Sequence, residues 1–105
     1  AISNVDEIAR VPGVDALLIG TNDLCMELNI PGQLDHPSII KAYEATISAC
    51  KKNGKYVGMG GIYSPDLIEK YVKMGVQLVL GGSDLGLMIS AGKEQTAKIR
   101  NMIKP

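Results

Sequence analysis

The apolar residues of this chain change their spacing several times, and the changes indicate strands that alternate with helices. Residues 14–19 are apolar except for Asp15, as expected for a strand that is covered on both faces. Residues 55–59 and 76–80 are two further stretches rich in apolar side chains, and we expect a strand in each. All three stretches lead into glycine and polar residues.

Between these stretches, apolar residues recur every three or four positions, which is typical of helices with one buried face. The clearest helix starts at residues 35–37, where Asp35 suits an N-cap and Pro37 a first turn, and it stops at residues 53–54. Its expected buried face consists of Ile39, Ile40, Tyr43, Ile47 and Cys50.

Three weaker helical patterns flank this helix. One ends at Pro12-Gly13, one runs from Ser64-Pro65 to Gly75, and the last covers about residues 91–103. Residues 24–35 are expected to form an irregular link. The buried face of the first of these helices is expected to hold Val5, Ile8 and Ala9. That of the second is expected to hold Leu67, Ile68, Tyr71 and Val72, and that of the last Ala97, Met102 and Ile103.

The predicted order is a helix followed by a strand, three times over, with a closing helix. Such alternation predicts an α/β fold with parallel strands and right-handed crossover connections. No low-complexity tract or linker divides the chain, so residues 1–105 are expected to form a single α/β segment.

The strand ends hold the main candidate site. In parallel α/β folds, ligands bind beyond the carboxyl ends of the strands, and glycine lets the backbone approach a ligand closely. We therefore expect one rim of the sheet to be marked by Gly20, Gly60, Gly61, Gly81 and Gly82.

Two carboxylates, Asp23 and Asp84, are expected at this rim. Such a group can hold Mg²⁺ or Mn²⁺, which prefer carboxylate oxygen, or it can cap the following helix without any ligand. We favour a cap or turn role for Asp84, and both interpretations stay open for Asp23. A metal site also needs a second acid, but Glu27 is expected to face solvent. His36, the only histidine, is expected to cap a helix rather than to catalyse.

Phosphate binding is an alternative use of the same rim. The N–H groups of Gly60-Gly61-Ile62 and Gly81-Gly82-Ser83 could hold a phosphate. The alternative function is therefore a non-catalytic small α/β domain, flavodoxin-like in layout, that binds a phosphate or a protein partner. The charge of Asp23 argues against it, because a carboxylate would repel the phosphate.

Composition excludes some classes of partner. Eleven basic side chains balance eleven acidic ones among 105 residues, which gives no reason to expect nucleic acid or an anionic membrane as partner. No apolar run reaches the ~20 residues of a membrane span. Cys25 and Cys50 lie far apart in sequence and are expected to be reduced thiols of a cytoplasmic protein. The start, AISNVDEIAR, lacks a signal-peptide pattern and an initiator Met, which suggests a trimmed chain or a piece of a longer one.

Three longer stretches resemble one enzyme family. IGTNDLCMELNIPGQLDHP, with NVDEIARVPGVD before it and LVLGGSDLGLM near the C-terminus, is similar to the pyruvate-dependent class II aldolases. These form the 4-hydroxy-2-oxoheptanedioate aldolase and citrate lyase beta-type (HpcH/HpaI) family, in which the motif is G-(P/T)-(A/N)-D-L. The resemblance covers essentially all 105 residues. The family fold is a (β/α)₈ barrel of ~250 residues, so the resemblance implies that this chain corresponds to its last three βα units and the helix before them.

The resemblance also implies site residues. Asp23 matches the second metal carboxylate of the family, and Gly20, Thr21 and Asn22 match the turn whose backbone holds the carboxylate of the keto acid. Leu87 falls near the apolar position that contacts the aldehyde part. No catalytic residue is assigned, because the family's metal-binding Glu, its Arg and its His-Asp base are expected in an N-terminal part outside these residues.

The implied reaction is reversible cleavage of a 4-hydroxy-2-oxo acid into pyruvate and an aldehyde. The implied cofactor is a divalent metal, Mg²⁺ or Mn²⁺ with Co²⁺ as a further possibility, which acts as a Lewis acid. The implied partners are the 2-oxo acid substrate and either the N-terminal part of the barrel or further copies of the chain, as a homo-oligomer.

Three strands cannot close a barrel, so one face of the sheet is expected to lack cover. We expect some inward residues of a barrel to be exposed in this chain, without a prediction of which ones. The candidates are Leu18, Val57, Met59, Leu78 and Leu80.

Overall fold

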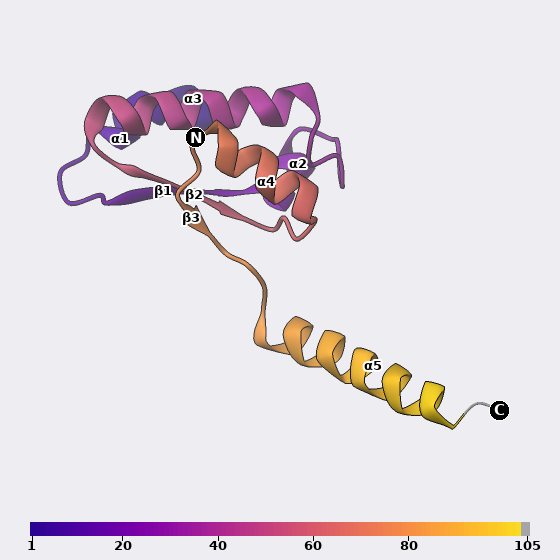
Figure 1. Cartoon of the computed structure of the whole chain (residues 1–105). Coiled ribbons are helices and arrows are strands. Elements are labelled where there is room, and N and C mark those ends of the chain that lie inside the picture. The colour runs from indigo at the N-terminus through magenta and orange to yellow at the C-terminus, as the bar shows by residue number, and fades with distance from the viewer. Residues whose placement is uncertain (104–105) are drawn as a thin grey trace.

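The computed structural model describes residues 1–103 and shows an α/β arrangement (Figure 1). Its elements, in chain order, are η1 (Ile2–Asn4), α1 (Val5–Ala9), β1 (Ala16–Gly20), α2 (Thr21–Glu27), α3 (Pro37–Asn53), β2 (Tyr56–Gly60), α4 (Pro65–Met74), β3 (Leu78–Val79) and α5 (Asp84–Met102). The three strands form one parallel sheet in the order β1-β2-β3, which confirms the predicted fold class.

The strand register separates the side chains of the sheet into two faces. β1 pairs with β2 over its whole length, from Ala16 opposite Tyr56 to Gly20 opposite Gly60. β2 pairs with β3 only where Leu78 and Val79 lie opposite its middle. Because side chains alternate along a strand, paired residues share a face, and every second pair faces the helices.

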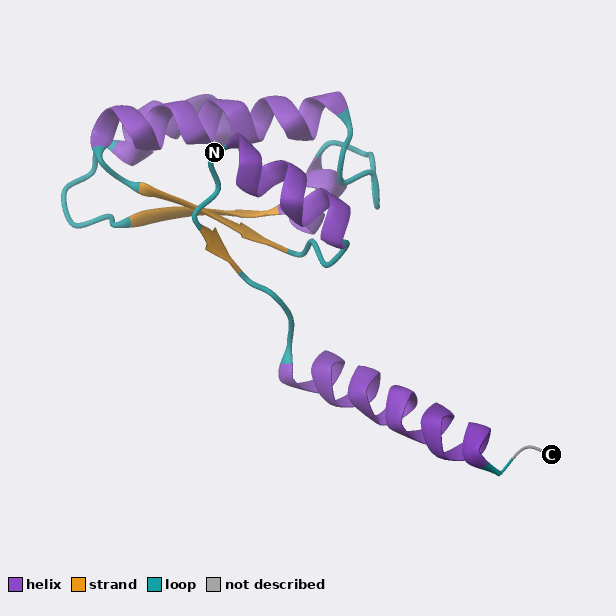
Figure 2. Cartoon of the chain, viewed as in Figure 1, coloured by secondary structure: helices purple, strands orange, loops and turns teal. Residues whose placement is uncertain are grey.

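Helices α1, α3 and α4 cover one face of this sheet (Figures 1 and 2). The core lies between them and the sheet, where Val57 and Met59 of β2 are 2% and 0% exposed. Tyr43 of α3 and Tyr71 of α4 are fully buried, and their rings stack with centroids 4.2 Å apart. The largest fully buried members of this core cluster are Ile39, Tyr43, Val57, Met59, Ile62 and Tyr71.

The opposite face of the sheet has no cover within the described residues. Leu18, Leu78 and Leu80 are 45%, 45% and 48% exposed, and Leu80 approaches Gly60 on this face. Of the five candidates for exposure, these three leucines therefore lie on the open face, whereas Val57 and Met59 face the helices. We call Leu18, Leu78 and Leu80 the open leucine face.

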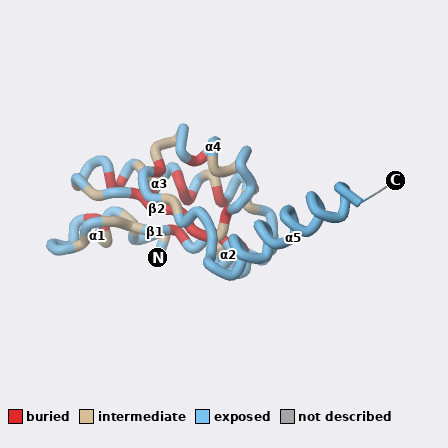
Figure 3. The backbone as a smooth tube through the Cα atoms, turned by 60° about the horizontal axis from the view of Figure 1, so that its bottom comes forward, coloured by how far each residue is buried: buried red, intermediate tan, exposed pale blue. Residues whose placement is uncertain are grey.

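The last helix differs most from the sequence-based expectation. α5 begins at Asp84 rather than near residue 91, and it extends away from the sheet (Figure 1). None of its residues is buried (Figure 3), so the expectation that Ala97, Met102 and Ile103 face inward is wrong. The radius of gyration, 17.6 Å, exceeds the ~13 Å of a compact domain of about 100 residues. A helix does form over the predicted residues, but it starts earlier than expected, and its apolar side chains have no packing partner in residues 1–103.

Local signals at the helix ends account for most of the other boundaries. His36 is the N-cap of α3, because its Nδ1 accepts a hydrogen bond from the N–H of Ser38 at 3.1 Å; the capping role expected of His36 is confirmed, and Asp35 is not the cap. Gly54, with φ +65°, ends α3 as expected. Val72 is 44% exposed, so its placement on the buried side of α4 is wrong.

None of the helices within residues 1–103 combines the length and the apolar character that a crossing of the bilayer needs.

The open leucine face makes a testable prediction about the 105-residue chain. Replacement of Leu18, Leu78 and Leu80 together by Thr should lower both the binding of an apolar dye and self-association measured by light scattering, because it removes exposed apolar surface without touching the core. The free energy of unfolding should change little. Val57→Thr, on the buried face, should instead lower it by about 1–3 kcal/mol, because a hydroxyl is placed in the core. Equal effects of the two sets on stability would contradict the assignment of faces.

Candidate functional site

The carboxyl ends of β1 and β2 form the candidate site, since Gly20 and Gly60 lie opposite each other as the last pair of the ladder. α2 starts at Thr21, immediately after β1. The chain therefore turns from strand to helix without a loop, and the first turn of this helix stands on the rim of the sheet.

Asp23 lies in that first turn and is exposed. Its side chain folds back over the strand end, because Oδ2 lies 3.2 Å from the position that a Cβ on Gly20 would occupy. A side chain at position 20 would therefore crowd the carboxylate. Gly20 and Asp23 both line an open hollow of about 580 Å³, together with Leu18, Leu24 and Glu27.

Capping does not explain Asp23. The N-cap of α2 is Gly20, and no side chain caps this helix. Asp84 behaves differently, because its Oδ1 accepts a hydrogen bond from the N–H of Leu85 at 2.8 Å next to the N-cap Ser83. The local turn role favoured for Asp84 is confirmed, whereas the carboxylate of Asp23 is left without a capping role.

The helix that carries Asp23 was partly overlooked in the sequence, where residues 24–35 were expected to be a link. The structure forms α2 over Thr21–Glu27 and leaves only the residues after it irregular. Thr21 and Cys25 are both fully buried and four positions apart, which places them on one face of a helix. That spacing was the available signal, but a Thr and a Cys form a weak apolar pattern.

Two side chains of the turn are engaged within the protein. The Thr21 hydroxyl is 2.8 Å from both the Tyr43 hydroxyl and the carbonyl oxygen of Gly60. Nδ2 of Asn22 donates to the carbonyl of Gly61 at 3.1 Å. The Thr21 side chain is thus bonded within the protein, and the contact of its backbone with the keto acid, which the family resemblance implies, stays a prediction.

Leu87 does not join this cluster in the described residues. It lies on α5 and is exposed, and it lines a separate hollow of about 380 Å³ with Tyr63, Gly82 and Ser83. The hollow at Asp23 is lined by other residues. The substrate contact expected of Leu87 stays a prediction.

The donor set at the rim suits a divalent cation but does not complete a site. Within residues 1–103, no three His, Cys, Asp or Glu side chains come together as metal ligands. Asp23 offers the carboxylate oxygens that Mg²⁺ and Mn²⁺ prefer, and Gly20 leaves room beside them. Asp23 therefore fits as one ligand, and the others would have to come from residues beyond those described.

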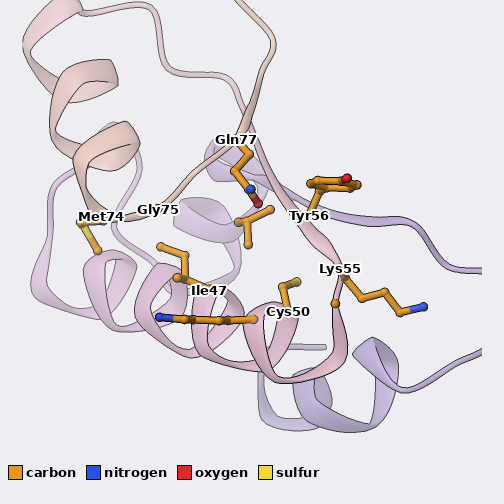
Figure 4. Close-up of a pocket in the computed structure, with 10 residues that line it drawn as sticks. Ile47, Cys50, Lys55, Tyr56, Met74, Gly75 and Gln77 are labelled. Carbon is orange, nitrogen blue, oxygen red and sulfur yellow. The ribbon is translucent and has the colours of Figure 1, made fainter.

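A further hollow, of about 460 Å³, lies at the other end of the strands (Figure 4). Ile47 and Cys50 of α3 line it together with Tyr56, at the start of β2, and Gln77, just before β3. These are the amino ends of the strands, whereas ligands of parallel α/β folds bind at the carboxyl ends. Burial raises the pKa of the Cys50 thiol, which disfavours a reactive thiolate there. We therefore place the functional site at the Asp23 rim.

Comparison with known proteins shows the family of the chain. Residues 1–91 match the family described as HpcH/HpaI aldolase/citrate lyase. The chain belongs to this family. A 2-dehydro-3,6-dideoxy-6-sulfogluconate aldolase from Pseudomonas putida is 33% identical over all 105 residues, and a 5-keto-4-deoxy-D-glucarate aldolase from Klebsiella pneumoniae subsp. pneumoniae is 34% identical over 90 residues, or 86% of the chain.

The HpcH/HpaI chain is shorter than these relatives. It spans 41% of the Pseudomonas protein and 35% of the Klebsiella protein, in each case the C-terminal portion. The crystal structure of an HpcH/HpaI aldolase from Desulfitobacterium hafniense DCB-2 superposes with a TM-score of 0.82 and 28% identity, over 100% of this chain and 40% of that one. The sheet and its helices thus correspond to the end of an aldolase barrel, as the sequence predicted.

The Asn22–Gly61 contact gives a prediction about the rim. Gly61→Ala should lower the free energy of unfolding by about 1–3 kcal/mol, because φ at this residue is +81° and the new Cβ would stand 2.6 Å from Nδ2 of Asn22. Gly81→Ala is the matched control, since a Cβ there meets nothing within 4 Å, and it should be nearly neutral. Urea unfolding of both variants checks this. Adding Asn22→Ala to Gly61→Ala should recover only the part of the loss that comes from the clash.

Proposed function

We propose that residues 1–105 are the C-terminal part of a (β/α)₈ barrel that cleaves a 4-hydroxy-2-oxo acid reversibly into pyruvate and an aldehyde. The observation that carries the proposal is the position of Asp23: an exposed carboxylate without a capping role, in the first turn after β1, at the carboxyl edge of the sheet. Membership of the HpcH/HpaI family and the similarity to aldolases support it.

In this proposal Asp23 is one of two carboxylates that hold a divalent cation, Mg²⁺ or Mn²⁺ with Co²⁺ as a further possibility. The ion, when bound, supplies positive charge next to the keto oxygen of the substrate as the carbon–carbon bond breaks. Asp23 contributes negative charge and fixes one side of the ion. The second carboxylate, the base and an Arg would come from the N-terminal part of the barrel.

The turn before Asp23 is suited to the carboxylate of the keto acid. The first N–H groups of a helix have no partner within it, and no side chain caps α2. The N–H groups of Thr21 and Asn22 are therefore free of helix partners at the rim, next to Gly20. We propose that this backbone binds the substrate carboxylate, and that Leu87 contacts the aldehyde part.

The uncovered surfaces support a larger assembly. The open leucine face leaves the inner side of the sheet exposed, and α5 has no buried residue. Several exposed side chains along α5 are large and apolar, namely Leu85, Leu87, Met88, Ile89, Ile99 and Met102. We propose that the N-terminal part of the barrel covers the sheet, that the protein is a homo-oligomer, and that it is cytoplasmic, which accords with two buried free thiols.

The alternative, a self-contained small α/β domain that binds a phosphate or a protein, is less well supported. A doubly wound domain needs helices on both faces of its sheet, and here α1, α3 and α4 all lie on one (Figure 2). Asp23 would also place a negative charge beside the phosphate.

Metal titration tests the proposed role of Asp23. In the full-length protein that contains these residues, Asp23→Ala should weaken Mn²⁺ binding, measured by calorimetry, by more than the 10–100-fold that loss of an outer-shell group costs. Glu27→Ala is the matched control, because Glu27 lines the same hollow one helical turn further along and is expected to be solvated. It should leave the affinity nearly unchanged. Equal Mn²⁺ affinity in the wild type and Asp23→Ala would remove Asp23 from the site.

A further inference from the structure

We propose that Thr21 and Tyr43 form a buried hydroxyl pair that positions Asp23 and thereby sets the affinity of the rim for its divalent cation. This inference rests on the proposed metal-binding role of Asp23. Neither side chain would touch the ion or the substrate, because both are 0% exposed and face the core. Their effect would be transmitted through the first turn of α2.

The hydrogen-bond directions in this pair follow from the number of protons available. A carbonyl oxygen can only accept, so the Thr21 hydroxyl must donate its single proton to the carbonyl of Gly60, 2.8 Å away. The Tyr43 hydroxyl, also 2.8 Å away, must then donate to Thr21. The result is a directed chain from Tyr43 through Thr21 to the backbone of Gly60.

This chain ties the start of α2 to the end of β2. The last backbone pair of the two strands is Gly20 with Gly60. Beyond it, the side chain of Thr21 bonds to the carbonyl of Gly60, and that of Asn22 bonds to the carbonyl of Gly61. The two side chains thus extend the attachment of one strand end to the other past the last backbone pair.

Asp23 follows directly after these two attachments, in a helix that has no side-chain cap of its own. A carboxylate serves as a metal ligand only if its distance to the ion is right to within ~0.2 Å, and such precision needs supporting contacts around the ligand. Of the two attachments, the Thr21 bond is fully buried, whereas the Asn22 bond is exposed to water. The buried bond is therefore the better candidate for holding the turn in place.

The ring of Tyr43 is itself held firmly, because it is fully buried and stacks on the ring of Tyr71. Burial raises the pKa of the Tyr43 phenol. Tyr43 is therefore protonated at neutral pH and can donate to Thr21.

A general contribution to core stability is the competing explanation, and the chain offers matched controls for it. Thr46 is also a buried threonine whose hydroxyl makes a 2.8 Å bond, but it bonds to Ala42 within α3, away from the rim. Tyr71→Phe removes a buried phenol hydroxyl while it keeps the ring that stacks on Tyr43. Neither control touches the Thr21–Gly60 attachment.

The experiment measures Mn²⁺ affinity, by paramagnetic resonance of the free ion, in the full-length protein. Thr21→Val, which removes the bond to Gly60, should weaken binding about tenfold, the lower end of the loss that outer-shell groups cause. Tyr43→Phe keeps that bond and removes only the donor to Thr21, so it should weaken binding by a smaller factor that still exceeds the effect of Tyr71→Phe. Thr21→Ser, which keeps a hydroxyl, should bind like the wild type. Thr46→Val and Tyr71→Phe should also bind like the wild type, even where urea unfolding shows that they lose as much stability. Tyr43→Phe added to Thr21→Val should cost little more, because its partner is already gone.

The outcomes separate this inference from the proposed function. If Asp23→Ala weakens binding but Thr21→Val and Tyr43→Phe match their controls, the positioning role is overturned and the metal role of Asp23 stands. If Asp23→Ala leaves the affinity unchanged, both are overturned. Should Thr21→Val fail to fold, Tyr43→Phe decides alone, since it keeps the stacked ring and removes only the donor to Thr21; an Mn²⁺ affinity equal to that of Tyr71→Phe would then overturn the positioning role.

Discussion

The parallel pairing of β1 with β2 is the constraint on which the rim depends. It brings two strand ends, far apart in sequence, to the same level, with Gly20 opposite Gly60. Once these ends are level, the side chains of Thr21 and Asn22 reach the backbone of the neighbouring strand, and Asp23 is carried to the edge where ligands of parallel sheets bind. If the pairing of β1 with β2 slipped by one residue, Thr21 would turn outward and the Asp23 carboxylate would leave the carboxyl edge of the sheet.

The two faces of the same sheet differ in how far helices cover them. On one face, α3 and α4 bury Val57 and Met59. On the other, the open leucine face is about half exposed, and at ~25 cal/mol per Å² of apolar surface its cover would add several kcal/mol of stability. In an aldolase barrel this is the inner side, which strands from the N-terminal part would fill. In the proposed barrel, the cover for this face and the further ligands of the proposed metal site would come from the same residues outside this chain.

The sequence predicted well where the information is local. The period of the apolar residues located α3 and α4, the glycine after each strand located the rim, and the motif around Asp23 indicated the family. Prediction from the sequence failed where the burial of a side chain depends on a packing partner elsewhere in the structure. α5 has a regular apolar pattern, and its residues such as Met102 were assigned an inward side, but a pattern cannot show whether anything lies opposite. The length of α2 was missed because Thr21, a polar residue, supplies a buried position.

The same property of Thr21 explains why a strand can end on a carboxylate beside a glycine. Gly20 leaves the space into which the Asp23 side chain folds, and a Cβ there would come within 3.2 Å of it. Space alone would allow the carboxylate to move, however, and a mobile ligand binds an ion weakly. The buried hydroxyl of Thr21 limits that movement from below, with Tyr43 as its donor. The Asp23 side chain thus needs open space on one side and a fixed turn on the other, and two adjacent residues meet these requirements. Gly20 has no side chain, and the side chain of Thr21 faces entirely inward.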